Sequence, residues 1–412
     1  MSQPIMSHIS DAEFVIIGGG AVGCGVAYTL ARGGVKDILL IERAADVAQV
    51  TTAQGAGLCG QPRSTLERTL LAMHSVATFR ELQRDSKVQP EWHEVGSLRI
   101  ALTEKRVAEL HQLKAVADQA KLETELIDNA AAHKLWPAME FADVKAVLWC
   151  PSDGYMRPYA VASSYAYQSR KLGVRIATNT TVEEILSNSG RVSAVKTSRG
   201  IASCRYVINA AGANAYHVAK LVGLELPIVP VRHEYFVSVP VEGMVPDLPC
   251  FRVPELTLYG RPCEGGLLLG GWEAQSMQTD PREYGLNAQP PPVEPDWAVL
   301  NSFEEQFSRL LPQTRGVEKT RVGRGWPTFT PDGRFIIGES RRVPGFIMAG
   351  GCNAHGISGS AGIGRLVYES IFEGKPSDYV KSLSPDRFTE NPWSWKEARR
   401  EAARVYETYY GV

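Results

Sequence analysis

The feature that most constrains the fold of this chain is a glycine-rich turn near its N-terminus. We expect a buried strand over residues 13–17 and a helix over residues 22–32, with the sequence Gly-Gly-Gly-Ala-Val-Gly at 18–23 between them. Gly18, Gly20 and Gly23 match G-x-G-x-x-G in the strand–turn–helix context that binds dinucleotides. Such a turn lets the backbone approach a pyrophosphate, and the helix N-terminus supplies N–H groups for it.

An acidic residue follows the next expected strand. That strand covers residues 37–41, and Glu42 comes directly after it. A carboxylate at this point accepts hydrogen bonds from ribose hydroxyls and repels a 2′-phosphate. The pattern therefore predicts a dinucleotide site in a Rossmann-like α/β domain. The alternative is a glycine-rich turn in another kind of α/β sheet.

Two later segments favour FAD over a nicotinamide nucleotide. Residues 206–212 are an apolar strand that ends in a turn of small residues. Residues 345–351 repeat this pattern before a glycine-dotted helix expected over 358–372. A large cofactor contacted by three separate parts of the chain explains these segments better than NAD bound by one part.

Charge, hydrophobicity and cysteine usage exclude several classes of protein. The 412 residues predict two or three domains, and 44 Lys and Arg balance 45 Asp and Glu, so nothing favours binding to nucleic acid or an anionic membrane. No membrane-spanning stretch is expected, and residues 1–10 do not predict a secretory signal. Seven dispersed cysteines without a C-x-x-C pair predict a reducing, cytoplasmic location and no metal site.

Over residues 12–390 the chain resembles the FAD-dependent amine oxidoreductases related to D-amino acid oxidase. The resemblance is most specific at 15–23 with Glu42, 51–58, 259–273 and 350–375. The dimethylglycine and sarcosine dehydrogenase branch is the most similar. Residues 52–58 follow the outline of its Thr-Trp-His-Ala-Ala-Gly-Leu segment, and residues 265–271 resemble its Gly-Gly-Leu-Leu-Leu-Gly-Gly segment.

The resemblance implies an α/β (α+β) fold of two domains. A discontinuous Rossmann-like FAD-binding domain is expected from residues 11–90, 150–230 and 320–385. A substrate domain on a largely antiparallel sheet is expected from 91–149 and 231–319, followed by a C-terminal helical tail at 386–412.

The sequence adds local predictions within this arrangement. Residues 101–135 have the apolar spacing of an amphipathic helix, and 229–239 alternate like a strand. Residues 255–269 predict two strands around a turn, and the proline-rich segment 289–295 predicts a surface loop.

Two positions that hold the flavin covalently in relatives differ here. The tethering histidine of the dehydrogenase branch falls at Gln54, and the tethering cysteine of monomeric sarcosine oxidases falls at Gly325. Neither residue can form such a bond, so non-covalent FAD is expected. The residues expected to contact the cofactor are Gly18, Gly20, Ala21, Val22, Gly23, Glu42, Arg43, Thr51, Thr52, Gln54, Ala56, Gly57, Leu58, Val182, Ala211, Gly212, Gly325, Gly351, Asn353, His355, Gly356 and Ile357.

The resemblance also indicates catalytic residues. His233 and Tyr259 lie in segments similar to those that supply an active-site histidine and tyrosine, and His355 falls in the loop expected near the flavin ring. His233 can take up the amine proton or orient the substrate. The alternatives are a core histidine bonded to a carbonyl group and a tyrosine that only packs.

The substrate carboxylate is expected to need an arginine. The candidates, in order, are Arg261, Arg252 and Arg324, with a solvated surface arginine as the alternative for each. The arginine that glycine oxidase uses here corresponds to Trp326, which suggests a more hydrophobic amine.

The resemblance implies hydride transfer to flavin N5 from the C–H beside nitrogen in a small secondary or tertiary amine or an N-methylated amino acid. Hydrolysis of the iminium then gives formaldehyde and the demethylated amine. The acceptor is oxygen or another redox partner. Leu268 replaces a lysine that promotes reaction with oxygen in monomeric sarcosine oxidase, and oxidase and dehydrogenase both stay open.

A second hypothesis is an FAD-carrying subunit of a hetero-oligomeric amine or D-amino acid dehydrogenase. The long dehydrogenases continue into a folate-binding domain, which this chain is expected to lack. The basic, aromatic tail, including Trp395, Tyr406, Tyr409 and Tyr410, would then contact another chain. Homo-oligomers, hydroxy-acid or glycerol phosphate oxidation, and RNA modification are further alternatives, the last disfavoured by the near-zero net charge.

Overall fold

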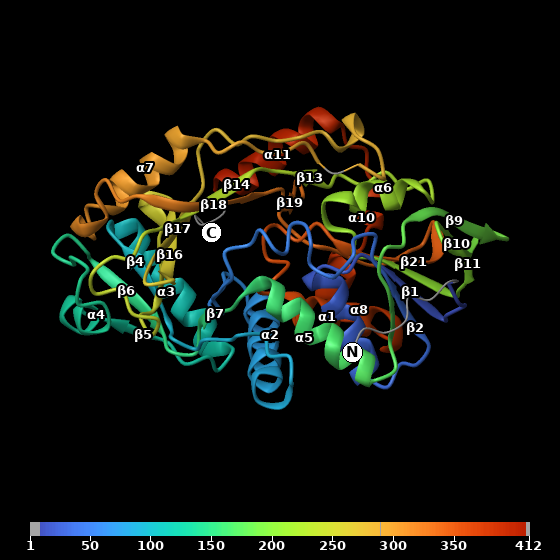
Figure 1. The fold of residues 1–412 in the computed structure, drawn as a ribbon, viewed down its shortest axis with the longest axis horizontal. Helices are drawn as coiled ribbons and strands as arrows, with labels where there is room; N and C mark the ends of the chain where they lie inside the picture. Colours follow the sequence, from blue (N-terminus) through green and yellow to red (C-terminus); the bar gives the residue numbers. More distant parts are fainter. Residues whose placement is uncertain (1–8, 289, 409–412) are drawn as a thin grey trace.

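The computed structural model describes residues 9–288 and 290–408, and two large sheets organise them (Figure 1). The first sheet has the strand order β20-β21-β12-β1-β2-β8. Its neighbours pair in parallel, except for antiparallel β20 and β21. The strands of this sheet are β1 (Phe14–Ile17), β2 (Ile38–Ile41), β8 (Arg175–Ala177), β12 (Tyr206–Asn209), β20 (Ile336–Ser340) and β21 (Val343–Gly350).

Both faces of the six-stranded sheet are covered, which explains why its strands are apolar throughout. Phe14 and Ile16 of β1 pack in one core, and Val15 and Ile17 pack in the other. One face carries the helices α1 (Ala21–Arg32), α2 (Leu66–Asp85), α5 (Pro158–Lys171) and α8 (Ser360–Phe372). The other carries β9 (Val182–Asn188), β10 (Arg191–Thr197), β11 (Gly200–Ser203) and α6 (Ala215–Lys220).

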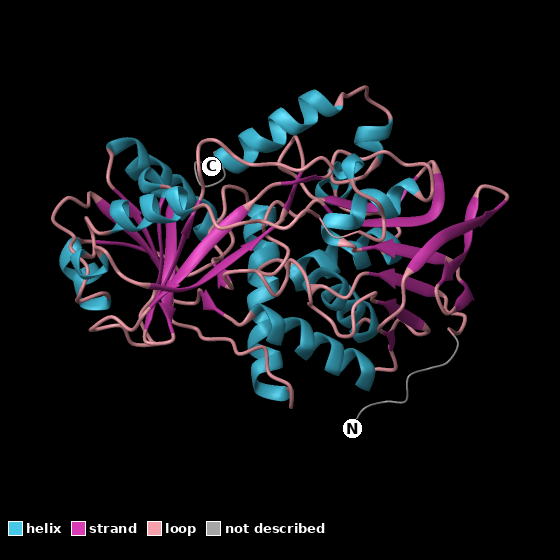
Figure 2. Ribbon diagram, turned by 45° about the horizontal axis from the view of Figure 1, so that its top comes forward, coloured by secondary structure: helices cyan, strands magenta, loops and turns pink. Residues whose placement is uncertain are grey.

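The second sheet has eight strands in the order β18-β14-β17-β16-β15-β4-β6-β5 and lies in the other half of the molecule (Figure 2). All neighbours are antiparallel except β4 and β15, as the prediction of a largely antiparallel sheet requires. The strands of this sheet are β4 (Ser97–Ala101), β5 (Glu125–Ile127), β6 (Ala146–Cys150), β14 (His233–Ser238), β15 (Cys250–Val253), β16 (Leu258–Cys263), β17 (Gly266–Gly271) and β18 (Lys319–Gly325).

Shorter elements complete the chain. The helices α3 (Glu104–Gln119), α4 (Asn129–Leu135) and α7 (Trp297–Phe307) accompany the eight-stranded sheet. Two short pairs join β3 (Leu58–Cys59) to β7 (Gly154–Tyr155) and β13 (Val229–Pro230) to β19 (Thr328–Phe329). The last helices are α9 (Asp378–Ser382), α10 (Asp386–Thr389) and α11 (Trp395–Glu407).

Local predictions on the described residues agree with the structure except in two places, and residue 289 of the loop predicted at 289–295 lies outside the described residues. The helix expected over 101–135 is divided: α3 ends at Gln119, β5 follows, and Asp128 caps α4 by accepting a hydrogen bond from the Ala131 amide at 2.7 Å. Cross-strand pairing of β5 with β6 overrides the helical pattern there. The strand expected over 229–239 is likewise interrupted between β13 and β14.

The described part of the tail packs on its own chain. Helix α11 lies beside β13 and β19 (Figure 1), and the buried Tyr406 ring meets the Phe329 ring edge-on at 5.5 Å. The Trp395 indole packs edge-on against Tyr216 and donates to Glu225 at 2.7 Å. Tyr409 and Tyr410 lie outside the described residues.

The domain boundaries stay a prediction. Strand β18 pairs with β14 in the eight-stranded sheet, although the expected boundary at 320 assigns almost all of it to the FAD-binding domain. Among the described residues, no helix is long and apolar enough to cross a membrane.

Candidate active site

The glycine turn brings β1, α1 and β12 into close contact. Gly18 has a φ of +109°, and a Cβ there would lie 2.5 Å from the carbonyl oxygen of Ala210, at the end of β12. A Cβ on Gly23 would overlap the Gly18 carbonyl oxygen. These contacts require glycine, and they place the N-terminus of α1 at the carboxyl ends of the strands, where ligands bind in such sheets.

Glu42 follows β2 and braces the turn. Its carboxylate accepts hydrogen bonds from the Gly19 amide at 2.7 Å and from the Ala44 amide at 2.8 Å. It lines a cavity of about 820 Å³, which we call the Glu42 cavity. The predicted cofactor residues that line this cavity are Gly18, Gly20, Glu42, Arg43, Thr51, Thr52, Val182, Ala211 and Gly212.

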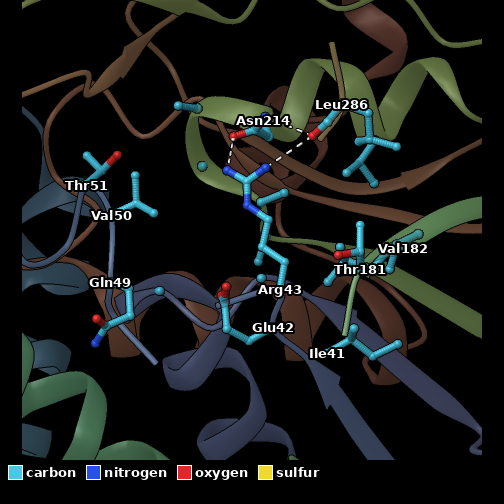
Figure 3. Close-up of a pocket in the computed structure, with 18 of the residues that line it drawn as sticks. Ile41, Glu42, Arg43, Gln49, Val50, Thr51, Thr181, Val182, Asn214 and Leu286 are labelled. Carbon is cyan, nitrogen blue, oxygen red and sulfur yellow. Dashed lines mark hydrogen bonds between the residues drawn. The ribbon is translucent and has the colours of Figure 1, made fainter. Parts of the chain in front are cut away.

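Arg43 and Leu286 are far apart in the sequence, and both line the Glu42 cavity, where they are joined by a hydrogen bond (Figure 3). Its guanidinium donates to Asn214 Oδ1 at 3.1 Å and to the Leu286 carbonyl oxygen at 3.2 Å. Asn214 donates in turn to the Ala288 carbonyl oxygen at 3.1 Å. Burial lowers the pKa of Arg43. No local sequence pattern predicts this contact, because Arg43 and Leu286 are brought together only by the tertiary fold.

A second cavity of about 1200 Å³ adjoins the first, and we call it the His233 cavity. Both cavities are lined by Gly20, Thr51, Thr52 and Gly212, so the two cavities are neighbours. The other predicted site residues that line the His233 cavity are Ala21, Val22, Gln54, Ala56, Gly57, Leu58, His233, Tyr259, Gly325, His355, Gly356 and Ile357.

His233 and Tyr259 form a pair in this cavity. His233 Nε2 lies 2.7 Å from the Tyr259 hydroxyl oxygen, and the two rings stack with centroids 5.6 Å apart. Burial, together with the positive charge of Arg252, lowers the pKa of His233 from 6.5 to about 4. His233 is therefore neutral at pH 7, which favours the orienting role over proton uptake.

His355 lies in the loop after β21. Burial, with the charges of Arg63 and Arg252, lowers the pKa of His355 well below 6.5, so this imidazole is also neutral at pH 7. Behind it, Asn353 holds the loop: its Oδ1 accepts from the Thr330 amide at 3.0 Å, and its Nδ2 donates to the Gly351 carbonyl oxygen at 2.9 Å.

Four predicted site residues lie away from the two cavities. Gly23 and Gly351 line neither, and Asn353 lines a third cavity. Arg261 does not line either cavity. Its Nε donates to the Ala56 carbonyl oxygen at 3.0 Å, and its guanidinium lies over the Tyr155 ring.

The arginine of the His233 cavity is the second candidate, Arg252. The first candidate, Arg261, lines a separate cavity together with Leu268. The third, Arg324, donates from Nε to the Val293 carbonyl oxygen. Trp326 lines the His233 cavity, and its indole donates to the Pro291 carbonyl oxygen at 2.7 Å.

The two tether positions are in contact. Gln54 and Gly325 both line the His233 cavity, and a Cβ on Gly325 would overlap the Gln54 amide. An amide and a bare backbone therefore stand where relatives are expected to carry a histidine or a cysteine.

Comparison with known proteins shows the family to which this chain belongs. The family model described as "DAO: FAD dependent oxidoreductase" matches residues 13–370. The chain belongs to this family. The predicted family and its cofactor, FAD, are thereby confirmed, and the enzyme class is that of an FAD-dependent oxidoreductase.

The individual curated relatives share less than 30% of their aligned residues with this chain. Identity is 29% over 412 residues with "4-methylaminobutanoate oxidase (formaldehyde-forming)" of Paenarthrobacter nicotinovorans, covering 99% of this chain and 49% of the relative. It is 27% over 406 residues with mitochondrial dimethylglycine dehydrogenase of Rattus norvegicus, covering 97% and 47%. The chain thus spans about half the length of these curated relatives.

A solved structure supports the fold. L-proline dehydrogenase from P. horikoshii aligns with a TM-score of 0.82 and 22% identity, over 92% of this chain and 98% of that chain. The two-domain α/β fold predicted from the sequence is thereby confirmed.

The residues of this DAO-family chain fit FAD. The two neighbouring cavities hold a carboxylate beside the glycine turn and the His233–Tyr259 pair. Gly20 lines both cavities, and a Cβ there would stand 3.2 Å from Thr52 Oγ1. Glu42 suits the ribose end, and the His233 cavity suits the flavin ring and a substrate.

Proposed function

We propose that this chain oxidises a small secondary or tertiary amine, with N-methylated amino acids as the substrate class. The observation that carries the proposal is the His233–Tyr259 hydrogen bond in the same cavity as Arg252. A polar pair to position an amine and an arginine to attract a carboxylate thus lie in the cavity that adjoins the Glu42 cavity. The names of the two curated relatives, a methylaminobutanoate oxidase and a dimethylglycine dehydrogenase, point to the same class.

When bound, FAD supplies the acceptor for the hydride from the C–H beside the amine nitrogen. The chain's own residues orient the substrate. In this proposal neutral His233 orients the Tyr259 hydroxyl through Nε2, and the hydroxyl oxygen contacts the amine. The amine must be neutral to react, because its lone pair stabilises the iminium that forms. Water then hydrolyses the iminium to formaldehyde and the demethylated amine.

FAD is held here without a covalent bond. Gln54 and Gly325 lack the nucleophilic side chains that a tether needs. Backbone contacts from the turn, the Glu42 carboxylate and the segment held by Arg43 provide non-covalent binding instead.

The described aromatic residues of the tail do not favour the second hypothesis, a subunit that acts mainly through a partner. Trp395 and Tyr406 are engaged within the chain, and Tyr406 Oη donates to Glu273 Oε2 at 2.6 Å.

Product analysis tests the proposed reaction. The FAD-loaded protein is incubated in air with a panel of N-methylated amino acids, and formaldehyde, demethylated amine and hydrogen peroxide are measured. We expect formaldehyde and demethylated amine in equal amounts. Peroxide in equal amount identifies oxygen as the acceptor, whereas turnover that needs an added dye identifies a dehydrogenase. Formation of neither product across the panel would contradict the proposal.

A further inference from the structure

A short loop beside the His233 cavity is attached to the eight-stranded sheet. Residues 55–57, which we call the Ala56 loop, line this cavity. Each of their three carbonyl oxygens accepts a hydrogen bond from outside the loop. In chain order, the donors are Tyr235 Oη at 3.3 Å, Arg261 Nε at 3.0 Å and the Met156 amide at 3.0 Å. Tyr235 lies on β14 and Arg261 on β16, so two of the three donors come from the eight-stranded sheet.

Arg261 contacts both the Ala56 loop and the strand pair that follows it. Its Nη1 donates to the Pro262 carbonyl oxygen at 2.9 Å, and its guanidinium lies over the Tyr155 ring, 4.5 Å from the centroid. Tyr155 belongs to β7 and pairs with Leu58 of β3, the first residue after the loop. A planar guanidinium held by hydrogen bonds and by an aromatic face is fixed in one orientation. Arg261 is therefore a rigid connection between the sheet and the loop.

The position of Arg261 gives it a task other than binding a substrate carboxylate. It lines a cavity of about 1130 Å³, which shares Gly55 with the His233 cavity but not Arg261 itself. Arg252, in contrast, lines the His233 cavity together with Tyr259. The hydrogen bonds of Arg261 go to backbone carbonyl oxygens, and one of these belongs to the Ala56 loop.

The two side chains that hold the Ala56 loop flank Tyr259. Arg261 lies two residues after Tyr259 on β16, so both point to the same face, about 6.6 Å apart along the strand. Tyr235 and Tyr259 are both register partners of Gly270, from the strands on either side of β17. A Cβ on Gly270 would overlap the Tyr259 hydroxyl and lie 2.8 Å from Tyr235 Cβ. The Tyr259 hydroxyl and the loop are therefore fixed to one small area of the sheet.

We propose that Arg261, assisted by Tyr235, is a positioning residue that sets the separation between the Ala56 loop and the Tyr259 hydroxyl. The loop is expected to contact FAD, and the hydroxyl is the group proposed to contact the amine, so this separation aligns substrate and cofactor. A displacement of about 1 Å between reacting groups costs about 100-fold in rate. The effect on the reaction rests on the proposed amine oxidation, whereas the effect on the loop rests only on FAD binding.

The visible circular dichroism of bound flavin tests the loop without any amine. This signal depends on the asymmetric surroundings of the flavin ring, which include the Ala56 loop in this inference. Arg261→Gln loses the Nε bond and the contact with Tyr155, so we expect the signal of the FAD-loaded variant to differ from that of the wild type. Arg261→Lys keeps a positive charge and a donor, and should restore part of the wild-type signal. An unchanged signal in Arg261→Gln would overturn the inference.

Arg321→Gln is the matched control. Arg321 lines the same cavity as Arg261, but its guanidinium pairs with exposed Glu264 at 3.0 Å. We expect this variant to keep the flavin signal and the rate of flavin reduction of the wild type. If it changes both as much as Arg261→Gln does, the effect comes from the charge of the cavity, and the inference is overturned.

Anaerobic flavin reduction tests the alignment. The limiting rate constant and the dissociation constant of the amine are measured separately, by varying the concentration of an N-methylated amino acid that reduces the flavin. We expect Arg261→Gln to lower the limiting rate constant about 100-fold and to leave the dissociation constant nearly unchanged. Weaker binding of the amine with an unchanged rate constant would mean that Arg261 binds the substrate carboxylate, and would overturn the inference.

Tyr235→Phe gives a second, milder test. It removes the hydroxyl that donates to Gly55 and keeps the ring beside Gly270. We expect smaller changes of the flavin signal and the limiting rate constant, in the same direction as in Arg261→Gln. This variant carries the test if Arg261→Gln fails to fold, and no change in either measurement would then overturn the inference. If no amine in a broad panel reduces the flavin, the proposed function fails, and the flavin signal alone decides the role of Arg261.

Discussion

Gln54 and Gly325 are in contact in the His233 cavity, and a side chain at position 325 would overlap the Gln54 amide. The two positions lie far apart in the sequence, and the family resemblance implies that each corresponds to a covalent flavin tether in a different branch of related enzymes. Their contact places both alternatives at one point of the site. In this chain the two positions are a glutamine and a glycine, and neither can form a covalent bond to the flavin. FAD is therefore expected to leave when the protein unfolds.

The first prediction concerns this release. Precipitating the FAD-loaded protein with acid should leave essentially all of the flavin absorbance in the supernatant. Unfolded protein mixed with free FAD serves as the control for trapping in the precipitate. Flavin that stays with the washed precipitate beyond that control would contradict non-covalent binding.

The second prediction concerns the ribose end of the cofactor site. Glu42→Ala removes a carboxylate that accepts from two backbone amides and lines the cavity. Losing charge-assisted hydrogen bonds costs about 1.5–3 kcal/mol, so FAD affinity should fall about 10- to 100-fold. Fluorescence titration of the apoprotein measures this. Glu123→Ala, at an exposed position, is the matched control. An unchanged dissociation constant for FAD would mean that Glu42 does not contact the cofactor.

The third prediction concerns the His233–Tyr259 pair. Tyr259→Phe removes the hydroxyl bonded to His233 Nε2, and anaerobic flavin reduction should slow about 10- to 100-fold because a hydrogen bond to the amine is lost. FAD content should not change. Tyr167→Phe, on α5 and outside the Glu42 and His233 cavities, is the control. Equal rates of flavin reduction in the variant and the wild type would mean that Tyr259 only packs and does not contact the amine.

The fourth prediction concerns stability at acid pH. The pKa of His233 is about 4 in the folded chain and near 6.5 when exposed, because burial and then Arg252 disfavour its charged form. Between these values the unfolded chain binds more protons, so the free energy of unfolding should rise with pH and level off above about 6.5. One histidine contributes a slope of at most about 1.4 kcal/mol per pH unit.

Urea unfolding of the wild type and His233→Asn at several pH values measures this contribution. Other titrating groups affect both proteins, so the difference between the two curves isolates His233. We expect the variant to lose less stability between pH 6.5 and pH 4. Parallel curves would mean that the imidazole does not titrate as its burial implies.

The glycine turn and Glu42 of the candidate site could be predicted from sequence because they depend on local backbone geometry. Gly18, Gly23 and Glu42 act through a turn and the end of one strand, and their spacing carries that information. The structure places Gly18 and Glu42 on one cavity, with Gly23 packed behind the turn.

The substrate end depends on tertiary contacts that spacing does not encode. Arg261 lies two residues after Tyr259, yet its guanidinium is held by the Ala56 carbonyl group and the Tyr155 ring. Arg252 reaches the His233 cavity because the β15–β16 register places it beside Tyr259. The Arg43–Leu286 contact and the division of the 101–135 helix by β5 arise in the same way.

The most direct test of the proposed amine oxidation is an anaerobic titration of the FAD-loaded protein with N-methylated amino acids. We predict that at least one of them bleaches the long-wavelength absorption band of oxidised FAD completely, and that admitting air or a dye acceptor restores it. A protein that binds FAD and keeps this band unchanged across the whole panel would contradict the proposed function.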